Sequence, residues 1–307
     1  MNYTLHQLKI FLKVSELESI TKASEELFLT QPAVSIQLKK FQDQFSVPLT
    51  EVVGRKLFVT DFGKEIAKAA ENIINEVNAI TYKTAMYQND LAGRLKLSIV
   101  STGKYVMPFF LTKFMATHQA VDLAMDVTNK SLVVKSLEKN DVDFSLVSVV
   151  PDQLKTNQIE LLQNKLFLVA SPKLKIKKTN VKKSIFEKYP LIYREEGSAT
   201  RNQMEKFIQS QGIISKKKIE LTSNEAVKQA LIAGLGCSIM PLIGIRNEIK
   251  TGELEIIPMK GLPLVTHWNL IWLKAKKMSP VAKAFANHIL EERTNIVEDE
   301  FSWFENY

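Results

Sequence analysis

Apolar residues recur at helical spacing through the first 45 positions of the chain. In segment 5–17 they occupy one face, at Leu5, Leu8, Phe11, Leu12 and Val14. A second stripe has spacings of four, three and four residues, at Val34, Leu38, Phe41 and Phe45. Both stripes are typical of amphipathic helices that bury one side. The pattern therefore predicts a small helical core near the N-terminus.

Hydroxyl side chains mark where two helices of this core should begin. Thr21 stands where an N-cap would accept a hydrogen bond from an early backbone N–H, and Thr30 stands where a second helix would be capped. Gln31 and Pro32 open that second helix, because proline is well tolerated in a first helical turn. Its other face carries Ser35, Ile36, Lys39 and Lys40. A helix–turn–helix with such a polar second helix fits the major groove of DNA, and an ordinary helical hairpin is the alternative.

Residues 52–60 predict a β-hairpin, which would form the wing of a winged helix. Arg55 and Lys56 lie at its tip, next to Gly54. Cations at such a tip can contact DNA phosphates or the minor groove. A charged turn without a role in binding is the alternative.

A single long helix is predicted from about residue 62 to residue 90, because no proline and no glycine after Gly63 interrupts it. Its apolar positions alternate spacings of four and three, at Ile66, Ala70, Ile73, Val77, Ile80, Thr84, Tyr87 and Leu91. This heptad seam predicts that the helix pairs with a second copy of itself. A helix that packs on its own domain is the alternative.

From Gly93 onward, strand-like segments alternate with helical ones, which predicts an α/β domain with a parallel sheet of βαβ units. The predicted strands are 95–100, 123–128, 143–149, 161–171, 190–193, 219–222, 237–241 and 268–273. The predicted helices end near 118, cover 131–140, open at 196–201, and cover 224–233 and 280–292. Trp303 and Phe304 lie in a polar tail that the pattern does not place.

Small polar residues stand between strands and helices in both halves of this domain. Ser101 and Thr102 follow a strand and precede a helix, and Ser198 and Thr200 do the same later in the chain. Hydroxyls and free N–H groups at helix N-termini bind carboxylate or phosphate, whereas simple helix capping is the alternative. Open α/β sheets also hold their ligands at strand ends. The candidate ligand-binding residues are Ser101, Thr102, Lys104, Thr128, Ser148, Ser198, Thr200, Arg201 and Asn224.

The net charge of the chain changes this picture little. The 307 residues carry a formal net charge of +8, but residues 1–60 hold seven basic and six acidic residues. The basic excess lies later, in runs such as 173–183 and 216–218, which we interpret as solvated surface. A role in DNA binding therefore rests on the helix pattern rather than on global charge.

Residue types that several other functions need are absent or scattered. Cys237 is the only cysteine, which excludes an intrachain disulfide and a cysteine zinc cluster. The four histidines have no ligand spacing, and hydrolase, phosphate-loop and dinucleotide motifs are missing. We therefore expect no enzyme, no metal site and no cofactor. No apolar run reaches the ~18 residues of a membrane span, and a signal-peptide pattern is missing, so we expect a cytoplasmic protein without a membrane partner.

The segment from Ser19 to Phe41 resembles the DNA-binding segment of the LysR-type bacterial transcriptional regulators. It matches the pattern of that family directly at Ser19, Thr21, Ala23, Leu27, Gln31, Pro32, Ala33 and Ser35. Ile36 stands where a basic residue is usual. Segments 223–228, 232–241 and 269–272 are similar to the effector domain of the family. Segment 101–108 is similar to the branch that regulates carbon-fixation operons.

The resemblance implies a division of the chain into three parts. A winged helix-turn-helix DNA-binding domain would occupy 1–60, a linker and dimerisation helix 61–92, and an effector-binding domain 93–307. The effector domain would have two lobes built like periplasmic binding proteins. Lobe I would comprise 93–161 and 267–307, and lobe II would comprise 162–266.

The resemblance also implies a function. The chain would be a regulator that binds double-stranded DNA as a homodimer, pairs again into a tetramer, and responds to a small anionic metabolite such as an organic acid or phosphate ester. DNA contacts are expected from Thr21, Thr30, Gln31, Pro32, Ser35, Ile36, Lys39, Lys40, Arg55 and Lys56. Ile36 cannot make a bidentate contact to guanine but can touch a thymine methyl. The competing hypothesis is a two-lobed small-molecule-binding protein or enzyme without a transcriptional role.

Overall fold

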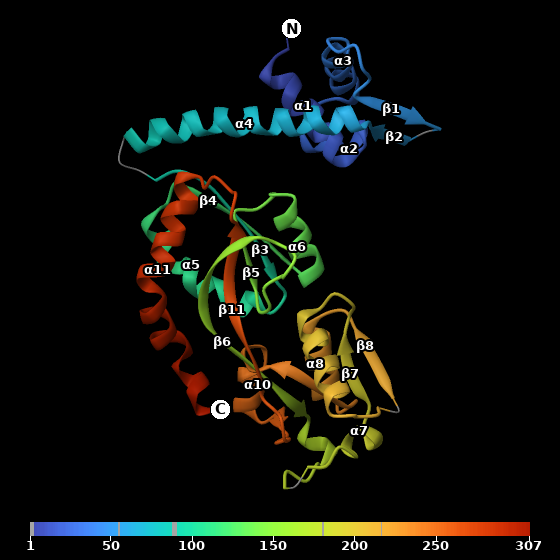
Figure 1. Cartoon of the computed structure of the whole chain (residues 1–307), viewed down its shortest axis with the longest axis vertical. Helices are drawn as coiled ribbons and strands as arrows, with labels where there is room; N and C mark the ends of the chain where they lie inside the picture. Colours follow the sequence, from blue (N-terminus) through green and yellow to red (C-terminus); the bar gives the residue numbers. More distant parts are fainter. Residues whose placement is uncertain (1–2, 55, 88–90, 180, 216) are drawn as a thin grey trace. The chain divides into compact units, whose positions relative to one another are not determined.

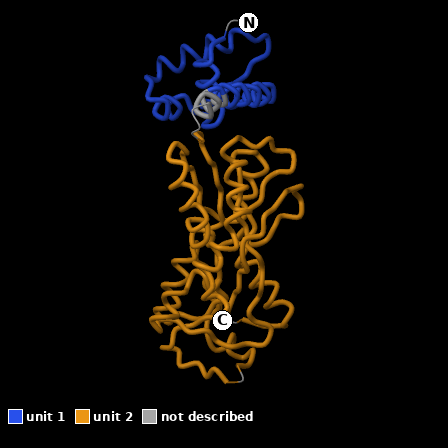
Figure 2. The backbone as a smooth tube through the Cα atoms, turned by 90° about the vertical axis from the view of Figure 1, so that its left-hand side faces the viewer, with its two compact units in different colours: residues 1–90 blue, residues 91–307 orange. Residues whose placement is uncertain are grey.

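The computed structural model describes residues 3–307, except for residues 55, 88–90, 180 and 216 and the side chains of 78, 79 and 81–87. The chain divides into two compact units, residues 1–90 and 91–307 (Figure 2). The first unit contains the predicted helix–turn–helix, and the second contains the α/β domain (Figure 1).

Helices and one hairpin build the first unit. Its elements are α1 (Leu5–Leu17), α2 (Ile20–Glu26), α3 (Gln31–Gln42), β1 (Thr50–Val53), β2 (Lys56–Val59) and α4 (Asp61–Tyr87). Phe11, Val34 and Phe41 are fully buried, and the ring centroids of Phe11 and Phe41 lie 5.1 Å apart. The two predicted stripes are thus confirmed as the buried faces of α1 and α3. Leu5 is an exception, because it is exposed at the start of α1, while Ile10 is buried. Phe45 is another, because it lies beyond the end of α3 at Gln42 and is only half-buried.

The start of α2 differs from the prediction. Ser19 is the N-cap, because its Oγ accepts a hydrogen bond from the Lys22 N–H at 3.3 Å. Thr21, which we predicted as the cap, is already inside the helix. The extended backbone at Ser19 is what allows its hydroxyl to reach back over the first turn. Thr30 caps α3 as predicted, and its Oγ1 accepts from the Ala33 N–H at 3.4 Å.

The predicted wing is confirmed as an antiparallel hairpin. Thr50 pairs with Val59 and Val53 pairs with Lys56, so the strands are joined by two residues. The first of these is Gly54, whose φ of 66° lies in the left-handed region that tight hairpin turns require. Arg55, the other predicted tip residue, lies outside the described residues.

The long helix α4 is fixed at its start by local chemistry. Thr60 Oγ1 accepts a hydrogen bond from the Gly63 N–H at 3.0 Å. A Cβ at position 63 would lie 2.0 Å from the carbonyl oxygen of Leu49, so only glycine fits this approach. The helix therefore starts directly after the wing.

The predicted heptad seam is only partly available for pairing with a second copy. Ile66 and Ala70 pack into the core of the first unit, because α4 contacts α1. Ile73 leaves 40% of its surface exposed. Leu91 was wrongly assigned to the seam, because α4 ends at Tyr87 and Leu91 packs against the core of the second unit. The predicted seam side chains at positions 84 and 87 lie outside the described part.

The second unit is built on one mixed sheet. Among the described residues, the strands follow the order β4-β3-β5-β11-β6-β9-β7-β8, and β10 pairs with β6. The strands are β3 (Gly93–Val100), β4 (Val121–Thr128), β5 (Phe144–Val147), β6 (Thr156–Ala170), β7 (Leu191–Arg194), β8 (Lys218–Leu221), β9 (Cys237–Pro241), β10 (Glu255–Ile256) and β11 (Leu264–Leu273).

Our prediction of a parallel sheet is wrong for the middle of this sheet. The pairs β3–β4, β3–β5, β7–β8 and β7–β9 are parallel, as βαβ units require. However, β6 and β11 run antiparallel to each other and to β5 and β9. The reason is that the two connections between the halves are themselves long strands, β6 and β11. They run in opposite directions between the halves and pair with each other within the sheet.

The strands β6 and β11 join two lobes (Figure 1). Lobe I holds β3–β5 with α5, α6 and α11, and lobe II holds β7–β10 with α7–α10. The helices are α5 (Met107–Thr117), α6 (Lys130–Glu138), α7 (Ile185–Lys188), α8 (Ala199–Ser210), α9 (Asn224–Ile232), α10 (Arg246–Thr251) and α11 (Pro280–Phe301). Short 3₁₀ turns cover Gly103–Tyr105, Pro172–Leu174, Leu242–Gly244 and Ser302–Asn306.

The C-terminal tail is packed onto this unit. The helix α11 continues nine residues beyond the predicted end at 292. Phe301 and Phe304 are buried in the main core, and the guanidinium of Arg246 lies 4.4 Å from the ring centroid of Trp303. Lys165 Nζ donates to the carbonyl oxygens of Phe304 and Tyr307. The aromatic residues of the polar tail therefore serve as anchors.

Candidate nucleic-acid interface and ligand site

The exposed face of α3 carries the residues that we predicted for DNA contact. Val34, Leu38 and Phe41 hold the opposite face in the core, so the polar positions of α3 share one exposed side. That side presents Gln31, Pro32, Ser35, Ile36, Lys39 and Lys40. Ile36 is 55% exposed although it is apolar. An exposed apolar residue among polar ones on such a face has the right chemistry to touch a thymine methyl.

The other predicted contact residues lie on neighbouring elements of the same unit. Thr21 is exposed on α2, and Thr30 is exposed although its hydroxyl already caps α3. Lys56 is exposed at the start of β2. The structure thus places three separate elements, α2, α3 and the hairpin, in one compact unit with their polar side chains in solvent.

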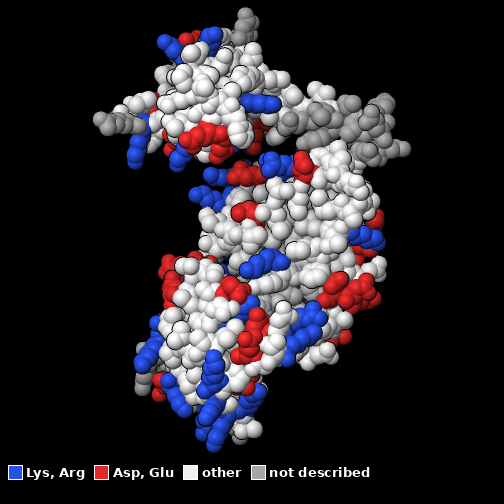
Figure 3. Space-filling view, turned by 180° about the vertical axis from the view of Figure 1, so that it is seen from behind, with Lys and Arg blue, Asp and Glu red and all other residues white. Residues whose placement is uncertain are grey.

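Basic side chains gather on lobe II rather than on the first unit. In Figure 3 they are densest at the lower end of the second unit, where Figure 1 places α7. The lysines of segment 173–178 are exposed there. This distribution agrees with our interpretation of the basic runs as solvated surface.

The structure brings together one candidate residue from lobe I and one arginine from lobe II. Ser101 directly follows β3 in lobe I, and Arg194 is the last residue of β7 in lobe II. Arg194 Nη2 donates to Ser101 Oγ at 3.1 Å. Arg194 is only 5% exposed, and its Nε and Nη2 also donate to the carboxylate of Glu195 at 2.7 and 2.8 Å. A guanidinium has five N–H donors, and its hydrogen bonds to carboxylate or phosphate are among the strong ones, so Arg194 has the chemistry to bind an anion.

Sequence reasoning missed Arg194. We ended the predicted strand at Tyr193 and examined only Ser198, Thr200 and Arg201 after it. The signal was present, because Arg194 directly follows a buried apolar strand, and a strand end of an open α/β sheet is where ligands bind.

A second contact joins the lobes close to the first. Gly197, in the loop after β7, has a φ of 83°, and a Cβ at this position would lie 2.6 Å from Ser131 Oγ. Ser131 lies in the first turn of α6, which Asn129 caps by accepting from the Leu132 N–H. Glycine is therefore needed where lobe II touches the start of α6.

A lysine beside this contact is partly desolvated. Burial lowers the pKa of Lys130, while Asp152 raises it and Lys206 of lobe II lowers it further. Lys130 thus places a positive charge at the start of α6. The positive end of the helix dipole lies there as well, so both would attract a bound anion.

The remaining candidate residues have different environments. Thr102 and Ser148 are buried near the ends of β3 and β5, and Ser198 caps α8. Both amide atoms of Asn224 are buried at the start of α9 without a hydrogen-bond partner among the described residues. Such atoms are rare in folded proteins. Thr128 and Thr200 are partly exposed at the ends of their elements.

Arg201 is held by carboxylates of its own lobe. Its Nε donates to Glu205 and its Nη1 to Glu220, both at 2.8 Å, and Nη1 also donates to the carbonyl oxygen of Arg194 at 3.1 Å. The hydrogen bond to Glu205 is the main reason why its pKa is raised. This geometry suits a residue that positions the Arg194 backbone.

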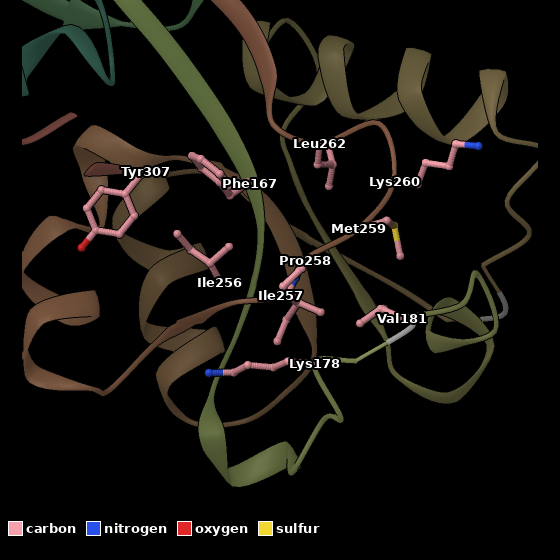
Figure 4. A pocket seen from close by; sticks show the side chains of 10 residues that line it. All are labelled: Phe167, Lys178, Val181, Ile256, Ile257, Pro258, Met259, Lys260, Leu262 and Tyr307. Atoms are coloured by element: carbon pink, nitrogen blue, oxygen red, sulfur yellow. The ribbon is translucent and has the colours of Figure 1, made fainter. Parts of the chain in front are cut away.

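Two hollows lie apart from the contact between Arg194 and Ser101. One of about 590 Å³ is lined by apolar residues of segments 256–262 and β6, with Lys178 and Lys260 at its edge. Figure 4 shows these two ammonium groups pointing in opposite directions, and Lys178 pairs with Glu255 at 2.8 Å. This hollow therefore does not gather cations around an anion. The other, of about 370 Å³, is lined by Lys104 among the candidate residues.

The described part of the chain lacks two features that other functions would require. Within the described part of the chain, no helix is long and apolar enough to cross a membrane. The same residues contain no group of three His, Cys, Asp or Glu side chains that could hold a metal ion. Burial raises the pKa of the Cys237 thiol to about 12, which leaves it protonated and unreactive.

Comparison with protein families matched both units. Residues 5–64 match the model of the bacterial regulatory helix-turn-helix protein, lysR family, and residues 88–294 match the model of the LysR substrate binding domain. The HTH-type transcriptional activator CmpR of Synechocystis sp. is 35% identical over 94% of this chain and 95% of its own. The RuBisCO operon transcriptional regulator of Acidithiobacillus ferrooxidans is 33% identical over 93% of each chain.

Solved structures share the fold. The regulatory domain of CcmR from Synechocystis PCC6803, in complex with 2-PG, is 27% identical with a TM-score of 0.62, and the match covers 66% of this chain and 98% of that chain. CbnR in complex with its target DNA is 19% identical with a TM-score of 0.65, covering 94% of this chain and 99% of that chain.

Proposed function

The chain belongs to the LysR family of bacterial transcriptional regulators, and we propose that a small anion bound between the lobes of its second unit controls how it binds DNA. The observation that carries this proposal is the hydrogen bond from Arg194 to Ser101. It joins the lobes through a guanidinium and a hydroxyl, which are both groups that bind carboxylate and phosphate.

The ligand class follows from the charges and from one relative. Arg194 and Lys130 are cationic and partly or fully desolvated near the lobe contact, which favours a compact anion over a neutral molecule. The CcmR domain, at 27% identity, was solved with 2-PG (2-phosphoglycolate). We therefore propose a phosphorylated or carboxylated small acid, with 2-phosphoglycolate as the first compound to test.

Such a ligand would act by shifting an equilibrium between arrangements of the lobes. An anion that accepts from Arg194 competes with Ser101 and Glu195 for the same donors, so it changes what holds the lobes together. A ligand shifts the equilibrium only by its difference in affinity for the two arrangements, and typical couplings are about 1–3 kcal/mol. The bound form would then present the DNA-binding units differently.

The proposed residues divide between the two sites. The DNA contacts are Thr21, Thr30, Gln31, Pro32, Ser35, Ile36, Lys39, Lys40, Arg55 and Lys56. The effector site comprises Ser101, Thr102, Thr128, Ser148, Ser198, Thr200, Arg201 and Asn224, with Arg194 and Lys130 added from the geometry. Lys104, which we also predicted for this site, lines a separate hollow. We keep the proposed domain division at 1–60, 61–92 and 93–307, a cytoplasmic homodimer or tetramer, and no catalytic role.

Replacing Thr102 by valine tests the effector site without disturbing the fold. Valine keeps the shape of threonine, and the Thr102 side chain makes no capping hydrogen bond that would be lost. We expect the affinity of the full chain for 2-phosphoglycolate to fall about tenfold or more, since a hydrogen bond to a charged group contributes roughly 1.5–3 kcal/mol. Titration calorimetry measures this directly, and an unchanged affinity would remove Thr102 from the site.

Replacing Lys40 by alanine tests the proposed phosphate contacts. Lys40 is exposed at the end of α3 and should bind the DNA backbone rather than a base. We expect weaker binding to all sequences alike, and a plot of log affinity against log salt concentration that is flatter by about one unit. Arg55→Ala should do the same. A changed base preference in either variant would instead place that residue on base edges.

A further inference from the structure

The hollow of about 370 Å³ that includes Lys104 lies where three distant parts of the second unit meet. One wall comes from the start of lobe I, at Lys104, Tyr105 and Phe109. Another comes from lobe II, at Lys228 and segment 243–248. The third comes from the C-terminal tail, segment 300–303. Its volume lies within the range of small-molecule sites.

Two of the cations in this hollow form no ion pair with a described residue, although the charge of Lys104 helps to lower the pKa of the Glu225 carboxyl. Lys228 pairs with Glu225 and Glu248 at 3.0 and 2.8 Å, so its charge is compensated. Lys104 and Arg246, in contrast, form no ion pair among the described residues and instead lie over aromatic rings, at 5.0 Å from Tyr105 and 4.4 Å from Trp303.

One nitrogen of this pair is also unsatisfied. The Nε of Arg246 is buried and has no hydrogen-bond partner within the described chain. A buried donor of a charged group that lacks an acceptor costs stability, so the site gains when an anion supplies that acceptor.

Aromatic side chains provide flat walls beside these cations. Phe109 leaves 38% of its surface exposed at the hollow. Trp303 is held in place by a hydrogen bond from its Nε1 to the carbonyl oxygen of Glu300 at 3.1 Å. Tyr105 lies close to lobe II, because a Cβ at Gly244 would be 3.2 Å from its ring.

We infer that this hollow is a second ligand site, which binds a compact anion carrying one flat ring. The phosphate or carboxylate would accept from Arg246 and Lys104, and the ring would lie against Phe109 and Tyr105. Because the walls come from both lobes and the tail, such a ligand would stabilise one arrangement of the lobes, as the anion at Arg194 does. The inference stands on the geometry of this hollow and goes beyond the proposed function.

Three probes distinguish the contribution of the anionic group from the contribution of the ring. Phenyl phosphate has the ring and the anion, methyl phosphate lacks the ring, and benzyl alcohol lacks the charge. In calorimetry on the full chain, phenyl phosphate should bind at least tenfold more tightly than either of the others. Equal binding of phenyl and methyl phosphate, or no binding of phenyl phosphate, would overturn the inference.

Variants locate the binding. Arg246→Gln should weaken phenyl phosphate at least tenfold, whereas Glu300→Gln should strengthen it, because this removes an exposed carboxylate from the rim while leaving the Glu300 carbonyl oxygen in place. Unchanged affinity in Arg246→Gln would place the ligand elsewhere.

A saturating concentration of 2-phosphoglycolate separates this site from the effector site. Phenyl phosphate should still bind when 2-phosphoglycolate is present, and its displacement would assign it to the Arg194 site and overturn the inference. If 2-phosphoglycolate itself does not bind, the proposed effector fails, while the phenyl phosphate result still decides this site.

Discussion

Replacing Ile73 by glutamate should convert the protein from a dimer into monomers. Ile73 leaves 40% of its surface exposed on α4, whereas its neighbours Ala70 and Ile74 pack on the core of the first unit. An exposed isoleucine in a heptad pattern is the position where a second helix would pack, and a buried unpaired carboxylate is strongly unfavourable there. Because a monomer can hold only one half of a two-fold DNA site, we expect DNA affinity to fall about 100-fold or more.

Sedimentation velocity and fluorescence anisotropy measure the two effects of this variant. Asn75→Glu is the matched control, because Asn75 is exposed on the same helix but lies off the seam. It should sediment and bind DNA like the wild type. If Ile73→Glu also sediments like the wild type, the helix α4 does not form the dimer.

Replacing Arg194 by glutamine should abolish the response to the effector while DNA binding persists. The variant removes the guanidinium that joins Ser101 of lobe I to the end of β7. A lost charge-assisted contact and a lost lobe contact together should weaken 2-phosphoglycolate binding about 100-fold, which corresponds to ~2.7 kcal/mol. Arg194→Lys should fall in between, because lysine keeps the charge but loses the fork geometry.

Two further variants make this result interpretable. Arg194→Gln leaves the partly buried carboxylate of Glu195 without this partner and should lower the melting temperature. The double variant Arg194→Gln with Glu195→Gln removes that unpaired charge, so recovery of stability without recovery of binding identifies a binding role. Arg293→Gln is the control elsewhere in the unit, since within the described residues Arg293 donates only to the Glu160 carbonyl oxygen. Wild-type affinity in Arg194→Gln would contradict the proposed site.

Elements defined by local chemistry could be predicted from the sequence. The bounds of α1 and β9 agree with the prediction, because a helical apolar stripe or a short apolar run between glycine and proline signals allows few alternatives. The start of α4 is also set by neighbouring residues, since Thr60 and Gly63 form a local cap. The choice between Ser19 and Thr21 failed because both hydroxyls are chemically suitable, and only the backbone conformation distinguishes them.

Features that depend on distant contacts could not be predicted. The antiparallel course of β6 and β11 depends on pairing between segments about 100 residues apart, which no local pattern encodes. The seam on α4 reads as one continuous stripe, yet Ile66 and Ala70 are used by the unit itself. The prediction of the ligand site was incomplete for a similar reason. Hydroxyls at helix starts are visible in the sequence, whereas the approach of Arg194 to Ser101 appears only in the folded unit.

The central claim is that an anion between the lobes changes how this protein binds DNA. Its most direct measurement is the affinity of the full wild-type chain for its best duplex, selected from random sequence, without and with saturating 2-phosphoglycolate. The account predicts a change of about fivefold or more in affinity, or a changed length of protected DNA, and the loss of this change in Arg194→Gln. Identical affinity and protection in the two conditions, with 2-phosphoglycolate demonstrably bound, would contradict it.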